Sequence, residues 1–226
     1  MTITTAKLTR GAGLAATLAG LLYILIQFIH PHEDLATVTT TGWVVVAAMT
    51  ALMALLALIG ITGMYMRQIE QMGVLGLIGY LIYSGFFLLV IGYSFIEVFV
   101  LPQLADDAPR FVSDSLALFA NETIVGDLGP LKALNPIAAV AYLFGGLLFG
   151  IALYRARILA RWATVLLAAG TAATPLVVSL VPHSVGRMAA IPVGVALAGL
   201  GYALMREQRS AAHDAVASLR SAPAGA

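Results

Sequence analysis

Cysteine is absent from the 226-residue sequence, and charged residues make up only 10% of it. Without cysteine, disulfides, thiolate metal sites and cysteine nucleophiles are excluded. Soluble domains normally contain about 25% charged residues, so this chain has too few polar groups to cover a water-facing surface. The net charge is only +1, and no basic tract is long enough to bind nucleic acid. We therefore expect no nucleic-acid partner.

Apolar residues dominate instead, with 61% hydrophobic residues and a mean hydropathy of +0.96. Six apolar stretches each approach the ~20 residues that a helix needs to cross a bilayer. The expected spans are Gly11–Ile29, Gly42–Met66, Gly73–Leu101, Asn135–Tyr154, Trp162–Val181 and Met188–Met205. We predict an all-α polytopic membrane protein with a single domain of six transmembrane helices over residues 1–206. A disordered cytoplasmic tail is expected over residues 207–226.

The loops predict an orientation, because positive charge stays on the cytoplasmic side of a membrane. Most Lys and Arg residues fall on the side that holds both termini, from Lys7 and Arg10 to Arg206, whereas most acids fall on the other side. An even number of spans is consistent with this. We expect a multi-pass protein of the cell membrane with cytoplasmic N- and C-termini.

One acid lies inside a long apolar run, Glu97 in the third span. At 100° per residue, Tyr83, Phe86 and Tyr93 fall within about 40° of Glu97, which places a carboxyl beside an aromatic stripe. An ionisable group in hydrocarbon is costly, so it turns toward the bundle interior and is a candidate site. The alternative is that Glu97 lies near the outer headgroups, solvated or paired with Arg187.

The first span has a polar stripe of its own. Tyr23, Gln27 and His30 are spaced by four and three residues, which places them on one side of a helix. The histidines at the outer side, His30 and His183 among them, are more typical of interfacial hydrogen bonding than of metal binding. We predict no metal and no cofactor.

A loop of about 30 residues between the third and fourth spans is long for a compact protein. Its middle, Asp107–Phe119, contains Ala108-Pro109 at the start of a helical pattern, with polar and apolar residues on opposite sides. We expect a short surface helix here that caps the pocket.

The chain resembles the small bacterial integral-membrane terpene cyclases of indole-sesquiterpenoid pathways. The resemblance rests on its size, its number of helices, the absence of a diphosphate-binding acid cluster, and an acid that faces aromatic residues. The resemblance implies that Glu97 is the catalytic acid, with Asp107 or Asp127 as a possible second acid. It also implies aromatic and polar residues that bind the substrate. These are Tyr83, Phe86, Tyr93, Trp43, Tyr142, Gln27, His30 and His183.

The resulting hypothesis is an enzyme, an isomerase or lyase, that cyclises a lipophilic prenylated substrate by protonation, without metal or diphosphate ionisation. A carboxylic acid that an apolar site keeps protonated can supply the proton, and π faces can stabilise the carbocation. The substrate would enter from membrane lipid. Two alternatives remain: a proton-coupled transporter or exporter of a lipophilic small molecule that uses Glu97, and a non-catalytic binding or accessory protein, including a haem protein that uses His30 and His183.

Overall fold

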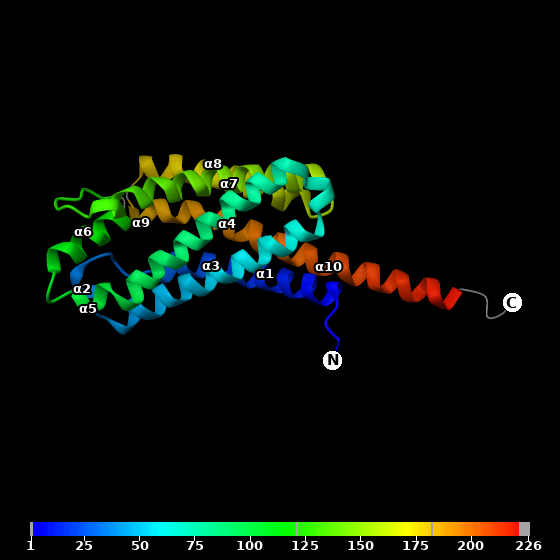
Figure 1. The fold of residues 1–226 in the computed structure, drawn as a ribbon, viewed down its shortest axis with the longest axis horizontal. Helices are drawn as coiled ribbons and strands as arrows, with labels where there is room; N and C mark the ends of the chain where they lie inside the picture. Colours follow the sequence, from blue (N-terminus) through cyan, green and yellow to red (C-terminus); the bar gives the residue numbers. More distant parts are fainter. Residues whose placement is uncertain (1, 121, 182, 222–226) are drawn as a thin grey trace.

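The structure, a computed structural model, describes residues 2–120, 122–181 and 183–221, without the side chains at 119, 183, 184 and 208–221. Within these ranges, six helices are long and apolar enough to cross a membrane (Figure 1). They are α1 (Thr5–Ile29), α3 (Thr41–Arg67), α4 (Ile69–Phe99), α7 (Leu134–Ala156), α8 (Arg161–Leu180) and α10 (Ile191–Ser221). The predicted all-α bundle of six membrane-length helices is confirmed.

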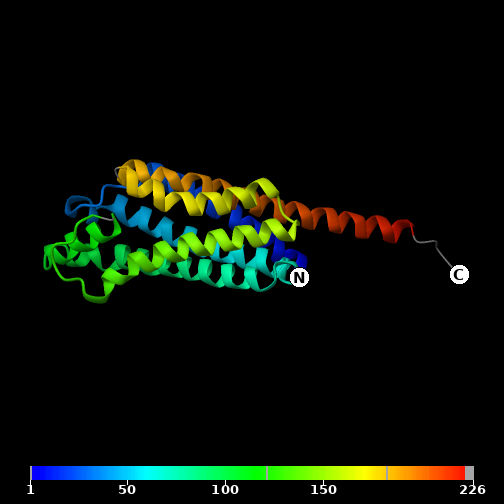
Figure 2. The same cartoon turned by 90° about the horizontal axis from the view of Figure 1, so that it is seen from above.

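Short elements gather at one end of the bundle, opposite the two chain termini (Figure 1). They are α2 (Leu35–Val38), α5 (Leu101–Leu104), α6 (Pro109–Phe119), η1 (Gly129–Ala133), α9 (His183–Gly186) and η2 (Arg187–Ala190). We call this the loop end, and the opposite end, which holds the N-terminus and the α3–α4 and α7–α8 turns, the terminal end. Helix α10 continues past the terminal end to Ser221 (Figure 2), and disorder of the tail stays a prediction.

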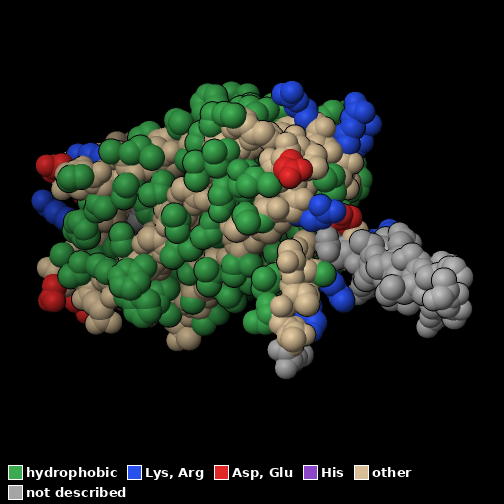
Figure 3. Space-filling model, turned by 45° about the vertical axis from the view of Figure 1, so that its right-hand side comes forward, with side chains coloured by type: hydrophobic (Ala, Val, Ile, Leu, Met, Phe, Trp, Pro, Cys, Tyr) green, Lys and Arg blue, Asp and Glu red, His purple; other side chains and the backbone are tan. Residues whose placement is uncertain are grey.

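The flank between the two ends is covered by hydrophobic side chains, whereas acidic and basic side chains gather toward the ends (Figure 3). Large apolar residues such as Leu81, Leu88 and Phe95 are more than half exposed on α4. A water-facing surface does not expose apolar residues at this density. The flank is therefore suited to contact with lipid, as expected for a multi-pass membrane protein.

Helix α4 begins earlier than the sequence predicts. The expected span starts at Gly73, but α4 starts at Ile69 and is kinked at Gly73, whose φ of +56° is left-handed. Only glycine adopts that conformation without strain. The kink joins the α3–α4 turn to the membrane-length part of α4.

The surface helix predicted in the long loop is confirmed as α6, which begins at Pro109 rather than Asp107. Proline suits the first turn of a helix because its missing N–H has no partner there in any case. Val112 and Leu116 are buried in a small apolar cluster with Trp43 and Leu101. Thus α6 packs on the loop end of the bundle through its apolar face.

Helix packing depends on close approach of backbones at small residues. Helix α1 lies against α3 and α10, and α4 lies against α7 (Figures 1 and 2). A Cβ atom at Gly79 of α4 would lie 2.5 Å from the backbone nitrogen of Phe149 of α7, and one at Gly145 of α7 would lie 2.6 Å from the nitrogen of Tyr83. Lipid gives no hydrophobic drive for helix association, so this contact supplies dispersion attraction in its place.

Gly79→Leu should therefore separate α4 from α7. We expect the free energy of unfolding to fall by about 1–3 kcal/mol, the usual cost of overpacking, in an SDS-titration or steric-trapping assay. The matched control is Gly85→Leu on the same helix, where a Cβ meets nothing within 4 Å. Equal losses in the two variants would contradict the role assigned to the α4–α7 contact.

Candidate functional site

A cavity of about 250 Å³ lies near the loop end of the bundle. It is lined by residues of α1, α3, α4, the start of α7 and η2. The lining residues are Tyr23, Ile26, Gln27, His30, Thr50, Met53, Phe86, Val90, Tyr93, Ser94, Glu97, Asn135 and Arg187. Polar side chains lie among the residues near the helix ends, and the deeper residues are mostly apolar or aromatic, so the cavity suits an amphipathic molecule.

Helical periodicity explains the two main walls. On α4, Phe86, Val90, Tyr93 and Glu97 follow at intervals of four, three and four residues, so one face of the helix lines the cavity. On α1, the stripe of Tyr23, Gln27 and His30 lines it in the same way. The structure thus brings together the two stripes that the sequence indicates.

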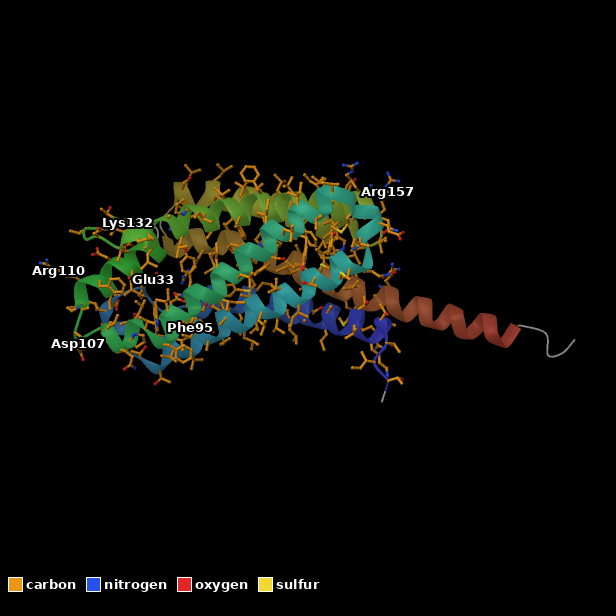
Figure 4. The ribbon with its side chains drawn as sticks, viewed as in Figure 1. Glu33, Phe95, Asp107, Arg110, Lys132 and Arg157 are labelled. Atoms are coloured by element: carbon orange, nitrogen blue, oxygen red, sulfur yellow. The ribbon has the colours of Figure 1, made fainter. Side chains whose placement is uncertain are left out.

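A charged cluster lies at the loop end of this cavity. The Arg187 guanidinium donates to Glu33 Oε1 at 2.9 Å, and His30 Nδ1 lies 3.7 Å from the same oxygen. The three side chains are only 13–17% exposed. Figure 4 shows Glu33 inside the loop end of the molecule. The pair connects the segment after α1 to η2, two parts of the chain that are 154 residues apart.

Glu97 lies beside this cluster. Glu33 and Arg187 are the charged groups that act on its carboxyl. Within the ranges that the structure describes, Arg187 forms a salt bridge with Glu33 and none with Glu97. The Glu97–Arg187 pair that the sequence suggested as an alternative is therefore not found. Among the described residues, the Glu97 carboxyl makes no hydrogen bond. It is therefore available to a molecule in the cavity.

Trp43 holds Glu97 in place through the backbone. Its indole Nε1 donates to the main-chain oxygen of Glu97 at 3.0 Å, and its ring meets the edge of His30 at a centroid distance of 6.0 Å. Trp43 itself is 2% exposed and does not line the cavity. It orients two cavity residues from behind, which differs from the substrate contact that the resemblance implies.

Two buried tyrosines support the aromatic wall in a similar way. Phe86 lines the cavity, with Tyr83 stacked at 6.1 Å and Tyr142 at 4.9 Å between ring centroids. Tyr142 donates to Thr174 Oγ1 at 3.4 Å. Tyr83 and Tyr142 are therefore behind the lining and pack against Phe86.

The remaining candidates lie elsewhere. Asp107 is exposed in the loop before α6, at the outer edge of the loop end (Figure 4). Asp127 is also exposed. Its Oδ1 accepts from the Gly129 N–H at 3.0 Å and pairs with Lys132 Nζ at 3.2 Å, and both contacts hold the pKa of Asp127 below its usual value. Neither acid lines the cavity, and the side chain of His183 lies outside the described residues.

The sequence indicated no site role for Glu33 or Asn135 and suggested Arg187 only as a possible partner of Glu97. The structure places Glu33, rather than Asp107 or Asp127, in the charged cluster near Glu97, and Asn135 and Arg187 line the cavity. Asn135 is the second residue of α7, and its amide donates to Leu118 O at 2.8 Å, which connects the cavity wall to α6. A polar residue at the start of an apolar span was the one local signal for it. Helix α6 itself contributes no lining residue.

Comparison with models of known protein families, with curated proteins and with solved structures found no match.

Proposed function

We propose that this protein is a membrane enzyme that binds one end of a prenylated, lipophilic substrate in the cavity and starts its cyclisation by protonation from Glu97. One observation supports this most: a carboxyl without a hydrogen-bond partner among the described residues shares the cavity with the aromatic rings of Phe86 and Tyr93. The carboxyl suits a general acid, and the π faces suit a carbocation.

The reaction conserves atoms. The Glu97 proton is added to one carbon of a substrate alkene, which leaves a carbocation on the other carbon. A second π bond of the substrate attacks this cation and closes a ring. Loss of a proton from a neighbouring carbon, to the Glu97 carboxylate or to water, gives a cyclic isomer of the substrate. No diphosphate leaves in this sequence, so cations that bind diphosphate are not needed for it.

Charge in the cavity is consistent with this role. Glu33 and Arg187 form an ion pair and neutralise one another, which leaves Glu97 as the acid whose proton can be exchanged. Burial in an apolar environment favours the neutral form of a carboxyl, and a neutral carboxylic acid is the form that donates.

Size limits what enters. Pockets for small molecules are usually about 300–1,000 Å³, and this cavity is about 250 Å³. A cavity of this size suits the reacting isoprene units of a prenyl chain, and the rest of the substrate would extend along lipid. The cavity volume therefore limits the reacting part of the substrate rather than the length of its prenyl chain.

The test uses purified protein in liposomes with a geranyl- or farnesyl-substituted indole dissolved in the lipid. We expect a product of unchanged mass that has lost one alkene, detected by chromatography and NMR. Absence of conversion with every prenylated arene tried would reject the cyclase proposal.

One observation favours a second candidate, proton-coupled transport of a lipophilic molecule. Arg187 is within electrostatic range of two carboxyls, Glu33 and Glu97, so protonation of either one shifts the balance between them. In this case, a pH gradient across the liposome should drive uptake or efflux that Glu97→Gln abolishes, with no cyclised product.

We also propose that the terminal end faces the cytoplasm of a cell-membrane protein. Arg155, Arg157 and Arg161 lie at this end, whereas the loop end has acids such as Asp107. Positive charge is retained on the cytoplasmic side. In intact cells a membrane-impermeant thiol reagent should label Ser113→Cys, an exposed position in α6, and should leave Thr2→Cys unlabelled until the cells are lysed. The reverse pattern would invert the orientation.

A further inference from the structure

The α7–α8 turn at the terminal end has three arginines within seven residues: Arg155, Arg157 and Arg161. All three are exposed, and Figure 4 shows Arg157 at the end of the molecule remote from the cavity. Within the described part of the chain, none of the three has an acidic partner. The Glu207 carboxylate at the same end is paired with Arg67. The turn is therefore a concentrated positive charge that the described protein does not neutralise.

Backbone conformation marks Arg157 as an unusual residue for its position. It follows the last residue of α7 with φ 58° and ψ 23°, in the left-handed region. Helices that end in this conformation usually have glycine there, because a side chain makes it less favourable. An arginine is conformationally less favourable than a glycine in this backbone geometry. What the arginine adds, and a glycine would lack, is a positive charge on the turn.

Arg161 is held in place without an acid. Its guanidinium donates to the Tyr154 hydroxyl at 2.8 Å, and its central carbon lies 4.6 Å from the centroid of the same ring. Stacking and hydrogen bonding restrict the side chain while most of its N–H groups stay unused. The arginine is thus ordered before any ligand arrives, which lowers the entropy cost of binding.

The neighbouring aromatics place this turn at the edge of the lipid. Trp162 follows Arg161 and is 57% exposed, yet the other edge of its ring packs over Gly199 of α10. Tyr154 is 38% exposed beside it. Exposed Trp and Tyr at helix ends are typical of the level of the lipid headgroups. The three arginines are one turn or less from these rings, at the level of lipid phosphates.

We propose that the α7–α8 turn is a binding site for the phosphate of an anionic phospholipid of the adjacent leaflet. Arg155, Arg157 and Arg161 supply the charge, and the exposed face of Trp162 contacts the glycerol and upper acyl region. Guanidinium groups match the geometry of phosphate oxygens. This site is separate from the cavity at the loop end and does not depend on the role of Glu97.

The test measures binding of phosphatidylglycerol to the full chain in neutral detergent or phosphatidylcholine nanodiscs, by native mass spectrometry and by the shift of the thermal unfolding midpoint. The variant is Arg155→Gln/Arg157→Gln/Arg161→Gln. The control is Lys7→Gln/Arg10→Gln/Arg206→Gln, which removes the same charge from the same end. Each arginine near the membrane surface should raise the affinity for an anionic lipid about fivefold. We therefore expect the phosphatidylglycerol affinity to fall roughly 100-fold in the turn variant and much less in the control.

Equal losses in the two triple variants would show diffuse attraction to a positive end and overturn the proposal, as would unchanged binding in the turn variant. Inorganic phosphate at the same concentration should not displace the lipid. Full displacement would identify a site for free phosphate instead.

A single substitution keeps the test independent of folding. Arg157→Gly suits the left-handed backbone, so the midpoint in lipid-free detergent should stay the same or rise while phosphatidylglycerol affinity falls about fivefold. Unchanged affinity in this stable variant would remove Arg157 from the site.

Discussion

Glu97→Gln is expected to lower the rate of substrate cyclisation by about 10²–10⁴-fold, the usual loss when a general acid is removed. Glutamine keeps the size of the side chain and its capacity for hydrogen bonds, but it has no acidic proton. Substrate affinity should change little, because the aromatic and apolar walls of the cavity are intact, so the loss should appear in kcat rather than KM. Steady-state assays in liposomes measure both parameters.

Glu70→Gln is the matched control, since it makes the same chemical change at the opposite end of the same helix, on an exposed side chain. Its activity should equal that of the wild type. Tyr93→Phe keeps the ring that lines the cavity and should cost far less than Glu97→Gln. Wild-type rates in Glu97→Gln would exclude Glu97 as the proton donor.

Arg187→Gln should cause the second large effect, a loss of about 3 kcal/mol in the free energy of unfolding. Removing one partner of a buried ion pair leaves the other charge uncompensated. Here Glu33 would lose its cation while Glu97 lies close by, and the pair is less than one-fifth exposed. SDS-titration unfolding at neutral pH measures the loss, which should shrink at acidic pH as the carboxyls take up protons.

The double variant Glu33→Gln/Arg187→Gln distinguishes the energy of the ion pair from the separate contributions of the two side chains. Two neutral amides can still hydrogen-bond, so most of the stability lost in Arg187→Gln should return. Losses that add fully in the double variant would mean that the two side chains contribute independently, and that no ion pair connects η2 to the segment after α1.

The spans and the surface helix were predictable because both depend on local sequence. About twenty apolar residues commit a segment to a membrane helix whatever it packs against. The spacing of Phe86, Tyr93 and Glu97 then fixes one face of α4, and the spacing of Tyr23, Gln27 and His30 fixes one face of α1. That these two faces meet follows from the packing of the bundle, which periodicity does not determine.

The charge cluster was not predictable because its members are far apart in the sequence. Glu33 belongs to the short segment after α1, and its partner Arg187 is 154 residues later. The family resemblance implied Asp107 or Asp127 as a possible second acid, yet both are exposed and outside the cavity lining. The role of Trp43 also differs from the predicted substrate contact. Only the structure reveals that its indole N–H donates to the main-chain oxygen of Glu97.

Deuterium incorporation tests the proton transfer from Glu97 to carbon most directly. Wild-type protein in liposomes prepared in D₂O should convert an alkene substrate to a cyclic product that contains one non-exchangeable deuterium, because the Glu97 carboxyl exchanges with solvent before it donates. Mass spectrometry and NMR would locate the deuterium at the carbon that was protonated. A cyclised product without deuterium, or deuterated product formed equally fast by Glu97→Gln, would contradict this account.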